Sequence, residues 1–196
     1  MIPAISRHVV YPLQEALLRR PTFAYLRELE KSQHYSRDDV ERLQQRKLKS
    51  LLTAAAQHCP WHAERIAAAG IELAAGAPLP TLAELRRLPT MEKKDAIENG
   101  ERMRWLDVPG GAQPYNTGGS SGEPLVFYFG RWRQASDAAG RIRARRWWGV
   151  DVGDREVYLW GAPVELAKTD HIKTVRDRLL NQLVLNAFEM SPSRMD

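Results

Sequence analysis

The chain has 196 residues, of which 43% are hydrophobic and 27% charged, a composition typical of a chain that folds around a core. Lys and Arg number 29 against 24 Asp and Glu, so the formal net charge is only +5. We expect most of these charges to form a solvated surface, although a basic excess also attracts ATP, coenzyme A, nucleic acid or an anionic membrane.

The N-terminal segment and the single cysteine exclude several classes of protein. No run of about 18 apolar residues is present, and Pro3, Arg7 and Pro12 interrupt the apolar core that a signal peptide needs. We therefore expect a cytoplasmic protein without a transmembrane segment, with peripheral membrane contact by the amphipathic first residues as an alternative. Cys59 is the single cysteine, so the chain has no intrachain disulfide. With His58 and His62 it offers three ligands where a structural zinc site usually needs four, so we expect a packed or surface cysteine.

The first hundred residues predict helices. Apolar spacing and turn residues place them at 13–31 with a break at Pro21, from an N-cap at Ser36 to the sequence HCP at 58–60, at 61–69, at 82–88, and from near Thr90 onward. Lys93 and Lys94 fall in the first turn of the last helix, where cations oppose the helix dipole. They either face an anion or a partner, or form a solvated pair.

The second half predicts strands as well as helices. Residues 103–114 resemble a loop, and strands are expected at 125–130 and 155–161, with helices at 131–148 and 172–188. This order predicts a βαβ crossover with neighbouring parallel strands. Two strands are too few for a stable parallel sheet, so we expect a second subunit to complete it or the remainder to be missing.

The segment Thr117–Glu123, with the sequence TGGSSGE, combines three glycines with three hydroxyl side chains. Glycines let the backbone approach a ligand closely, and consecutive backbone N–H groups can then surround phosphate oxygens. A flexible surface linker has the same composition, so both interpretations stay open at this point.

Three known phosphate-binding motifs do not fit this segment. The Walker loop needs GxxxxGK[ST], and both the spacing and the lysine are absent. The dinucleotide fingerprint follows a strand and opens a helix, whereas this segment precedes a strand. The protein-kinase glycine loop lies between two strands and is followed by HRD and DFG sequences, which the chain lacks.

The sequence TGGSSGEP resembles the phosphate-binding loop of the adenylate-forming enzymes, [ST][SG]G[ST]TGxP. Its surroundings are similar to the phenylacetate–coenzyme A ligase family and its relatives linked to capsular polysaccharide synthesis. Four stretches carry this resemblance, which spans about residues 40–190: LLTAAAQHCPWHAERIAAAGI, LAELRRLPTMEKKDAIEN, EPLVFYFG and RRWWGVDVGDREVYLWG.

The resemblance implies an ATP- and Mg²⁺-dependent, AMP-forming ligase that activates a carboxylic acid as an acyl-adenylate, usually for transfer to coenzyme A. The implied phosphate-binding residues are Thr117, Gly118, Gly119, Ser120, Ser121 and Gly122. The implied fold is an α/β one, with a helical region at 1–100 followed by an incomplete βαβ ATP-binding subdomain at 101–196. No catalytic residue and no metal ligand is implied within the chain.

Two departures from the family pattern matter. Glu123 stands where family loops often carry lysine, and an acid beside a triphosphate is unfavourable unless it turns outward or reaches Mg²⁺. The family's adenine-binding motif, ribose-binding aspartate and C-terminal catalytic lysine should all lie beyond residue 196. We therefore expect the N-terminal part of such an enzyme, inactive alone, with a homo-oligomer or a separately encoded C-terminal part as its partner.

Other residues suggest weaker candidates. Arg141, Arg143, Arg145 and Arg146 precede two tryptophans, which is typical of nucleic-acid binding, but a solvated face with the tryptophans in the core is favoured. Other candidate sites are an acid–base pair at Asp170 and His171, and a substrate-lining role for Trp160, Gly161 and Pro163 after the second strand. The alternative functions are a truncated non-catalytic remnant or interaction module, and a basic nucleic-acid-binding domain. If the chain is part of an AMP-forming ligase, no nucleic-acid partner is expected.

Overall fold

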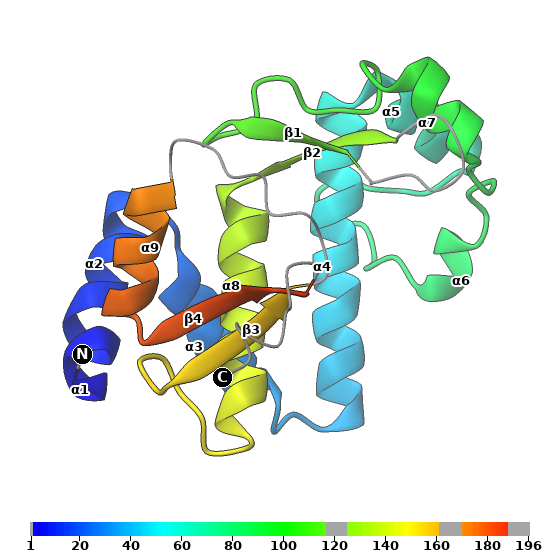
Figure 1. The fold of residues 1–196 in the computed structure, drawn as a ribbon. Coiled ribbons are helices and arrows are strands. Elements are labelled where there is room, and N and C mark those ends of the chain that lie inside the picture. The colour runs from blue at the N-terminus through cyan, green and yellow to red at the C-terminus, as the bar shows by residue number, and fades with distance from the viewer. Residues whose placement is uncertain (1, 117–124, 161–169, 188–196) are drawn as a thin grey trace. The chain divides into compact units, whose positions relative to one another are not determined.

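The computed structural model of the chain describes residues 2–116, 125–160 and 170–187 (Figure 1). The fold is mixed α/β and mostly helical, with small sheets. The chain forms two compact units: the first contains Met1–Leu26 and Ala135–Asp196, and the second contains Arg27–Gln134. The expected boundary near residue 100 therefore falls inside the second unit.

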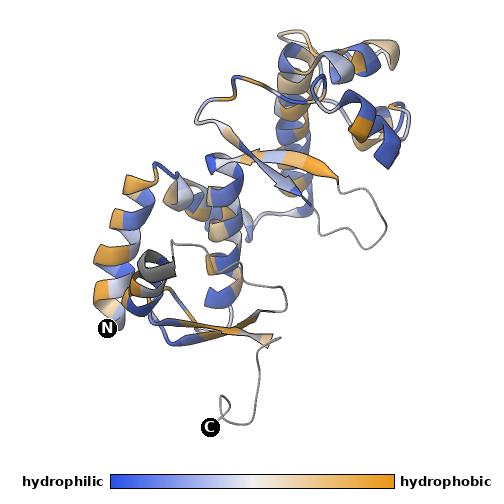
Figure 2. Ribbon diagram, turned by 45° about the horizontal axis from the view of Figure 1, so that its top comes forward, coloured by the Kyte–Doolittle hydropathy of each residue, from blue (hydrophilic) through white to orange (hydrophobic). Residues whose placement is uncertain are grey.

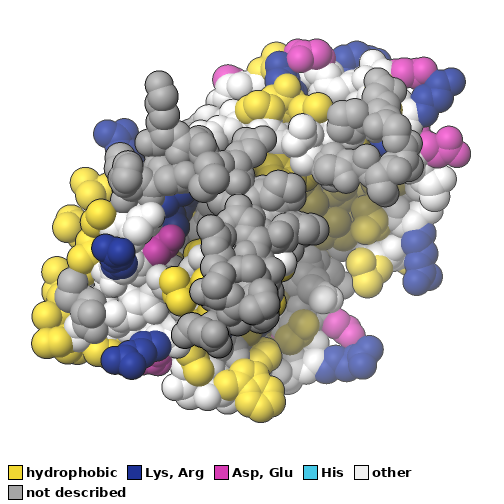
Figure 3. All heavy atoms as spheres, viewed as in Figure 1, with side chains coloured by type: hydrophobic (Ala, Val, Ile, Leu, Met, Phe, Trp, Pro, Cys, Tyr) yellow, Lys and Arg dark blue, Asp and Glu magenta, His cyan; other side chains and the backbone are white. Residues whose placement is uncertain are grey.

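The first unit begins with short helical segments. They are α1 (Pro3–Ile5), the π-helical turn η1 (Ser6–Val10), α2 (Tyr11–Leu17) and the start of α3 (Thr22–Ser32). The predicted break at Pro21 is confirmed: α2 ends before Arg19, whose φ of 52° is left-handed, and Pro21 precedes α3. Exposed apolar residues lie on these helices, among them Ile2, Val9, Leu13 and Leu17. Hydrophobic side chains gather over this part of the chain at the left of Figure 3.

Helix α8 (Arg131–Arg146) supplies the buried centre of the first unit. Its buried residues recur at helical spacing, as the sequence predicts: Ala135, Ala138, Ala139 and Ile142. Gly149, with a φ of +73°, follows the end of the helix, where a left-handed glycine is common. The prediction that the tryptophans lie in the core is wrong, because Trp147 is 61% and Trp148 85% exposed beyond the last helical turn.

The sheet of the first unit is parallel and has two strands among the described residues. Strand β3 (Glu156–Trp160) pairs with β4 (Gln182–Asn186), and α9 (Asp170–Leu179) lies between them in the chain. The expected helix over 172–188 is wrong beyond Leu179: Asn181 has a left-handed φ of 58°, and the next residues form β4. The βαβ unit is therefore β3–α9–β4, not the crossover from strand 125–130 that the sequence predicts.

The second unit is built on α4 (Arg37–His58) and α5 (Pro60–Ala68). The predicted cap is confirmed, because the Ser36 hydroxyl accepts a hydrogen bond from the Asp39 amide at 3.2 Å. Buried Leu52, Ile66 and Ile71 form the core, and Gly70, with a φ of +62°, ends the second helix. Figure 1 shows α4 as the longest element of this unit.

Two short helices follow, α6 (Leu82–Leu85) and α7 (Lys93–Asn99). Both carry a capping box, in which residue N3 bonds back to the N-cap backbone. The expected start of the second near Thr90 is wrong, because Glu92 is the N-cap and its amide donates to Asp95 at 2.8 Å. The expected helix over 82–88 stops at Leu85 and continues as a turn.

A hairpin of β1 (Ala112–Asn116) and β2 (Val126–Gly130) completes the second unit. The strand predicted at 125–130 is confirmed as β2, but its partner is the antiparallel β1, which lies in the expected loop. Part of this hairpin is hydrophobic and is drawn in orange in Figure 2. Among the described helices of both units, none is long and apolar enough to cross a membrane.

Candidate phosphate-binding hairpin

The segment singled out by the sequence joins the two strands of the hairpin. The pairing runs from Ala112 opposite Gly130 to Asn116 opposite Val126. The connection therefore leaves β1 and enters β2 at neighbouring positions. This pairing holds the two ends of a glycine- and serine-rich connection together, which reduces the entropy lost when its amides converge on a ligand.

Cross-strand aromatic contacts stabilise the hairpin. The Tyr115 ring centroid lies 5.2 Å from that of Phe127 and 5.5 Å from that of Phe129, within the range of favourable aromatic pairs. These three side chains share one face, and Tyr128 lies on the other. The ladder with β2 defines β1, and Pro114 within it is typical of a loop or an edge strand.

Glycines allow the backbones of the two strands to approach closely at the base of the hairpin. Gly110 and Gly111 have φ values of +90° and +72°, which favour glycine over any other residue. Across the ladder, a Cβ on Gly130 would collide with the carbonyl oxygen of Gly111. The sequence PGG before β1 therefore turns the chain into the hairpin and lets the two backbones approach.

Three arginines lie around the hairpin, each held in place. The Arg131 Nε atom donates to the carbonyl oxygen of Gly110 at 3.1 Å, and the Arg133 guanidinium lies 5.2 Å from the Phe129 ring centroid. Arg104 lies 4.4 Å from the centroid of Tyr128 and forms an ion pair with Glu101 at 2.8 Å. Fixed cations near the hairpin favour an anionic ligand, although Glu101 offsets part of their charge.

The predicted ligand residues themselves lie outside the described residues. These are Thr117, Gly118, Gly119, Ser120, Ser121 and Gly122, together with Glu123, Gly161 and Pro163. The structure places the backbone of Trp160 at the end of β3 and that of Asp170 at the start of α9, and it does not describe the side chains of Trp160, Asp170 and His171. The roles of all these residues stay predictions.

The connection after Asn116 was expected to differ from the protein-kinase glycine loop partly because that loop lies between two strands. The structure shows that the connection after Asn116 also lies between two antiparallel strands, β1 and β2. Topology therefore does not distinguish the two loops, and the absence of HRD and DFG sequences is the ground that separates them.

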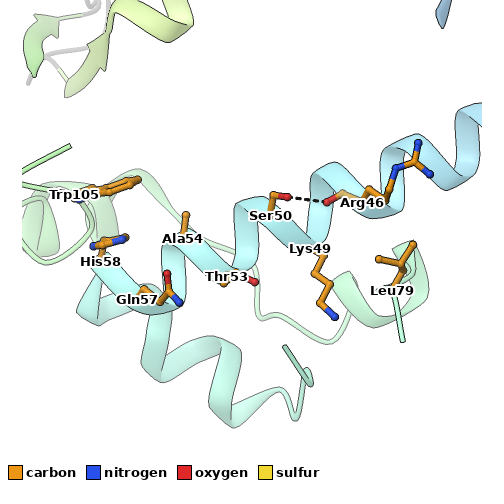
Figure 4. A pocket seen from close by; sticks show the side chains of 9 residues that line it. All are labelled: Arg46, Lys49, Ser50, Thr53, Ala54, Gln57, His58, Leu79 and Trp105. Atoms are coloured by element: carbon orange, nitrogen blue, oxygen red, sulfur yellow. Dashed lines mark hydrogen bonds between the residues drawn. The ribbon is translucent and has the colours of Figure 1, made fainter. Parts of the chain in front are cut away.

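The group around Cys59 is packed against aromatic residues. Cys59 is buried, which raises the pKa of its thiol, and the His58 ring stacks on Trp105 with centroids 3.8 Å apart. The stacked pair lines one end of a hollow on α4, which Figure 4 shows. Burial and the nearby Arg65 lower the pKa of His62. Within the described ranges, no group of three or more His, Cys, Asp or Glu residues is placed to hold a metal ion.

The four arginines near the end of α8 have local partners. Arg141 lies 3.6 Å from Asp137, Arg145 2.6 Å from Glu156 and Arg146 3.1 Å from Asp151, while Arg143 packs over the ring of Trp147. Lys94, at the start of α7, lies 3.6 Å from Glu98 on the same helix. These contacts favour local structural roles for the cations over a continuous nucleic-acid surface.

No protein-family model matches the chain, and no curated protein matches it at a significant level. The hairpin and the sequence motif between its two strands are therefore the features that bear on the class of protein.

Proposed function

We propose that the chain binds the β- and γ-phosphates of ATP through Thr117–Gly122 and belongs to an ATP-dependent, AMP-forming ligase as its N-terminal part. Such an enzyme activates a carboxylic acid as an acyl-adenylate and transfers it to coenzyme A, in the cytoplasm. The observation that supports this proposal is the pairing of Asn116 with Val126, which holds both ends of the glycine- and serine-rich connection together.

The expected contribution of the connection is electrostatic and positional. Its backbone N–H groups and the hydroxyls of Ser120 and Ser121 would donate hydrogen bonds to phosphate oxygens, and the hairpin would hold these donors ready before ATP arrives. Mg²⁺, which arrives bound to ATP, would neutralise part of the phosphate charge. Arg131 and Arg133, close to the hairpin, would add a positive potential.

Binding of Mg²⁺–ATP to this chain tests the proposal directly. Equilibrium dialysis should show ATP binding that becomes about tenfold weaker in the double variant Ser120→Ala plus Ser121→Ala, since charge-assisted hydrogen bonds are worth more than about 1.4 kcal/mol. Ser32→Ala is the matched control, because the Ser32 hydroxyl donates within its own helix to the Leu29 carbonyl. Unchanged ATP binding in the double variant would count against the assigned residues.

A second experiment addresses the reaction. We expect ATP–pyrophosphate exchange from a version of the protein extended at its C-terminus by the remaining motifs, and none from this chain alone. Exchange by the extended protein that survives the double serine substitution would exclude the connection as the phosphate site. The parallel pair β3 and β4 needs further strands for stability, and either a second copy of the chain or a separately encoded C-terminal partner would supply them. Light scattering tests the first possibility, because it measures the oligomeric state of the chain.

A further inference from the structure

The N-terminal helices of the first unit bury polar side chains and expose large apolar ones. The buried residues of η1 and α2 are Ser6 and Glu15, which are 0% and 2% exposed. Leu13 and Leu17, on the same helices, are 58% and 74% exposed. A surface helix of a globular protein turns its apolar stripe toward the core. The distribution in α1, η1 and α2 is the reverse, so their apolar side chains are not explained by the core of this unit.

Polar contacts fix which face of these helices is buried. The Ser6 hydroxyl donates to the Leu179 carbonyl oxygen at 2.6 Å. The Glu15 carboxylate accepts a hydrogen bond from the Thr22 hydroxyl and lies 3.7 Å from the Arg20 guanidinium. A rotation that buried the leucines would remove these partners, and a polar group without partners is costly to bury. The apolar side chains are therefore held outward.

The exposed apolar side chains form a row along the helices. Its members recur every four residues, which places them on one face: Ile5, Val9, Leu13 and Leu17. Ile2, which is 63% exposed, extends the row at its N-terminal end. Hydrophobic side chains gather over this part of the chain at the left of Figure 3. A contiguous apolar surface of this kind marks a site of contact with another protein or with a membrane.

The charges on this segment favour an anionic partner. Glu15 is the only acid among residues 2–20, all of which the structure describes, and it is buried. Arg19, which follows α2 with a left-handed φ of 52°, is exposed. A surface with an exposed cation and no exposed acid attracts anions. Large apolar residues on one face with basic residues beside them are typical of helices that lie in the surface of a membrane.

Two exposed tryptophans of the same unit favour a lipid surface independently. Trp147 and Trp148 follow α8, and both rings are exposed. The chain just after them lies against the N-terminal helices, because the Arg7 Nε atom donates to the Val152 carbonyl oxygen at 3.1 Å. Tryptophan is enriched at membrane–water interfaces, where its ring lies at the level of the lipid headgroups.

We infer that α1, η1 and α2 form a membrane anchor that binds the surface of an anionic lipid bilayer. The apolar row from Ile5 to Leu17 enters the boundary between headgroups and acyl chains, Arg19 lies among lipid phosphates, and Trp148 lies at headgroup level. The inference goes beyond the proposed function, because it uses none of the residues between Asn116 and Leu125.

Sedimentation with lipid vesicles tests the anchor. The chain should bind vesicles of phosphatidylcholine and phosphatidylglycerol in equal parts, and bind vesicles of phosphatidylcholine alone more weakly. The double variant Leu13→Gln plus Leu17→Gln should weaken binding to the anionic vesicles at least about tenfold, since two apolar side chains no longer enter the lipid. Leu51→Gln plus Leu82→Gln is the matched control, because both leucines are exposed and lie in the second unit. Circular dichroism should show the same helix content in both variants.

Two further measurements separate charge from insertion. Arg19→Gln should weaken binding to the anionic vesicles about fivefold, as the loss of one basic residue near a charged membrane does. Arg37→Gln is the matched control, because Arg37 is an exposed cation of the second unit that pairs with Glu41 at 3.0 Å. Vesicles with brominated acyl chains should quench the tryptophan fluorescence of the bound protein, and quench it less in Trp148→Phe.

Several outcomes would overturn the membrane anchor. They are no sedimentation with anionic vesicles, binding that the two leucine substitutions leave unchanged, and bound protein without any quenching. A dimer in lipid-free buffer that the same substitutions convert to a monomer would also overturn it, because the apolar row would then bind a second copy of the chain. Lipid binding that persists in the Ser120→Ala plus Ser121→Ala variant supports the anchor whether or not that variant binds ATP.

Discussion

The guanidinium of Arg145, on α8, lies 2.6 Å from the carboxylate of Glu156 at the start of β3. The same guanidinium donates to the Tyr158 hydroxyl, which donates in turn to Glu156 at 2.8 Å. Burial, and then the Glu156 carboxylate, raise the pKa of Tyr158. The three side chains thus connect the helix to the first strand of the parallel sheet.

Removing the cation of this network should destabilise the first unit. The side chain of Glu156 is only 12% exposed, so Arg145→Ala leaves a largely buried carboxylate without its ion pair. We expect the free energy of unfolding to fall by about 2–3 kcal/mol, measured by urea denaturation. Arg141→Ala, at an exposed pair with Asp137, should cost less than about 1 kcal/mol. Equal costs for the two variants would contradict a structural role for the network.

Gly153 permits a close contact with the N-terminal helices. Its φ is +90°, and an added Cβ would lie 2.5 Å from the Pro3 carbonyl oxygen and 2.8 Å from Ser6 Cβ. Gly153→Ala should therefore lower stability by about 3 kcal/mol, through steric overlap as well as backbone strain. Gly149→Ala is the matched control: its φ is +73°, but its Cβ would meet no atom within 4 Å, so only about 1 kcal/mol of strain applies. Urea denaturation followed by circular dichroism compares the two.

Tyr11 should make the stability of the first unit depend on alkaline pH. Burial, and then the Glu15 carboxylate, raise the pKa of Tyr11 to about 12, from an ordinary value of 10.0. Because the unfolded chain loses this proton at lower pH than the folded one, stability is complete below pH 10 and falls as the pH rises to about 12.

The variant Tyr11→Phe isolates this contribution from that of other groups that titrate above pH 10. We expect its free energy of unfolding to fall less than that of the unsubstituted protein over this interval, by at most about 2 kcal/mol. The same slope in both proteins would show that Tyr11 loses its proton at the same pH in the folded and unfolded chain.

Cys59 should report the opening of the second unit. It is the single cysteine, is 9% exposed at the junction of α4 and α5, and its thiol pKa is raised by burial. Because the thiolate is the reactive form, we expect reaction with Ellman's reagent at pH 8 to be at least about tenfold slower than in the urea-unfolded chain. Rapid and complete reaction of the native protein would mean that this junction is open in solution.

The helices with clear caps could be predicted from the sequence. Ser36 begins α4, and the residue before Pro60 ends it, because both signals act within one turn of the backbone. The chain over 182–186 could not be assigned in this way. Leu183 fits the spacing of a preceding helix, and only the pairing of β4 with β3 decides that it belongs to a strand.

The framework of the candidate site was predicted in part. The glycine- and serine-rich composition of the segment that ends before Leu125 predicts phosphate binding, which stays a prediction, and the sequence LVFYFG predicted the strand after it, which is β2. Pro114 concealed the strand before it, because proline is usually excluded from strands that need every amide. The hollow on α4 was not predicted, since it brings Trp105 to His58, 47 positions earlier in the sequence.

The sequence by itself determined the two ends of α4, the buried stripe of α8 and the chemical character of the connection after Asn116, because these depend on neighbouring residues. Only the tertiary structure decided that the connection closes an antiparallel hairpin, that the parallel pair is β3 and β4, and that Trp147 and Trp148 are exposed. Strand pairing and burial depend on residues far apart in the chain, and the free energy of such contacts is not encoded in any local pattern.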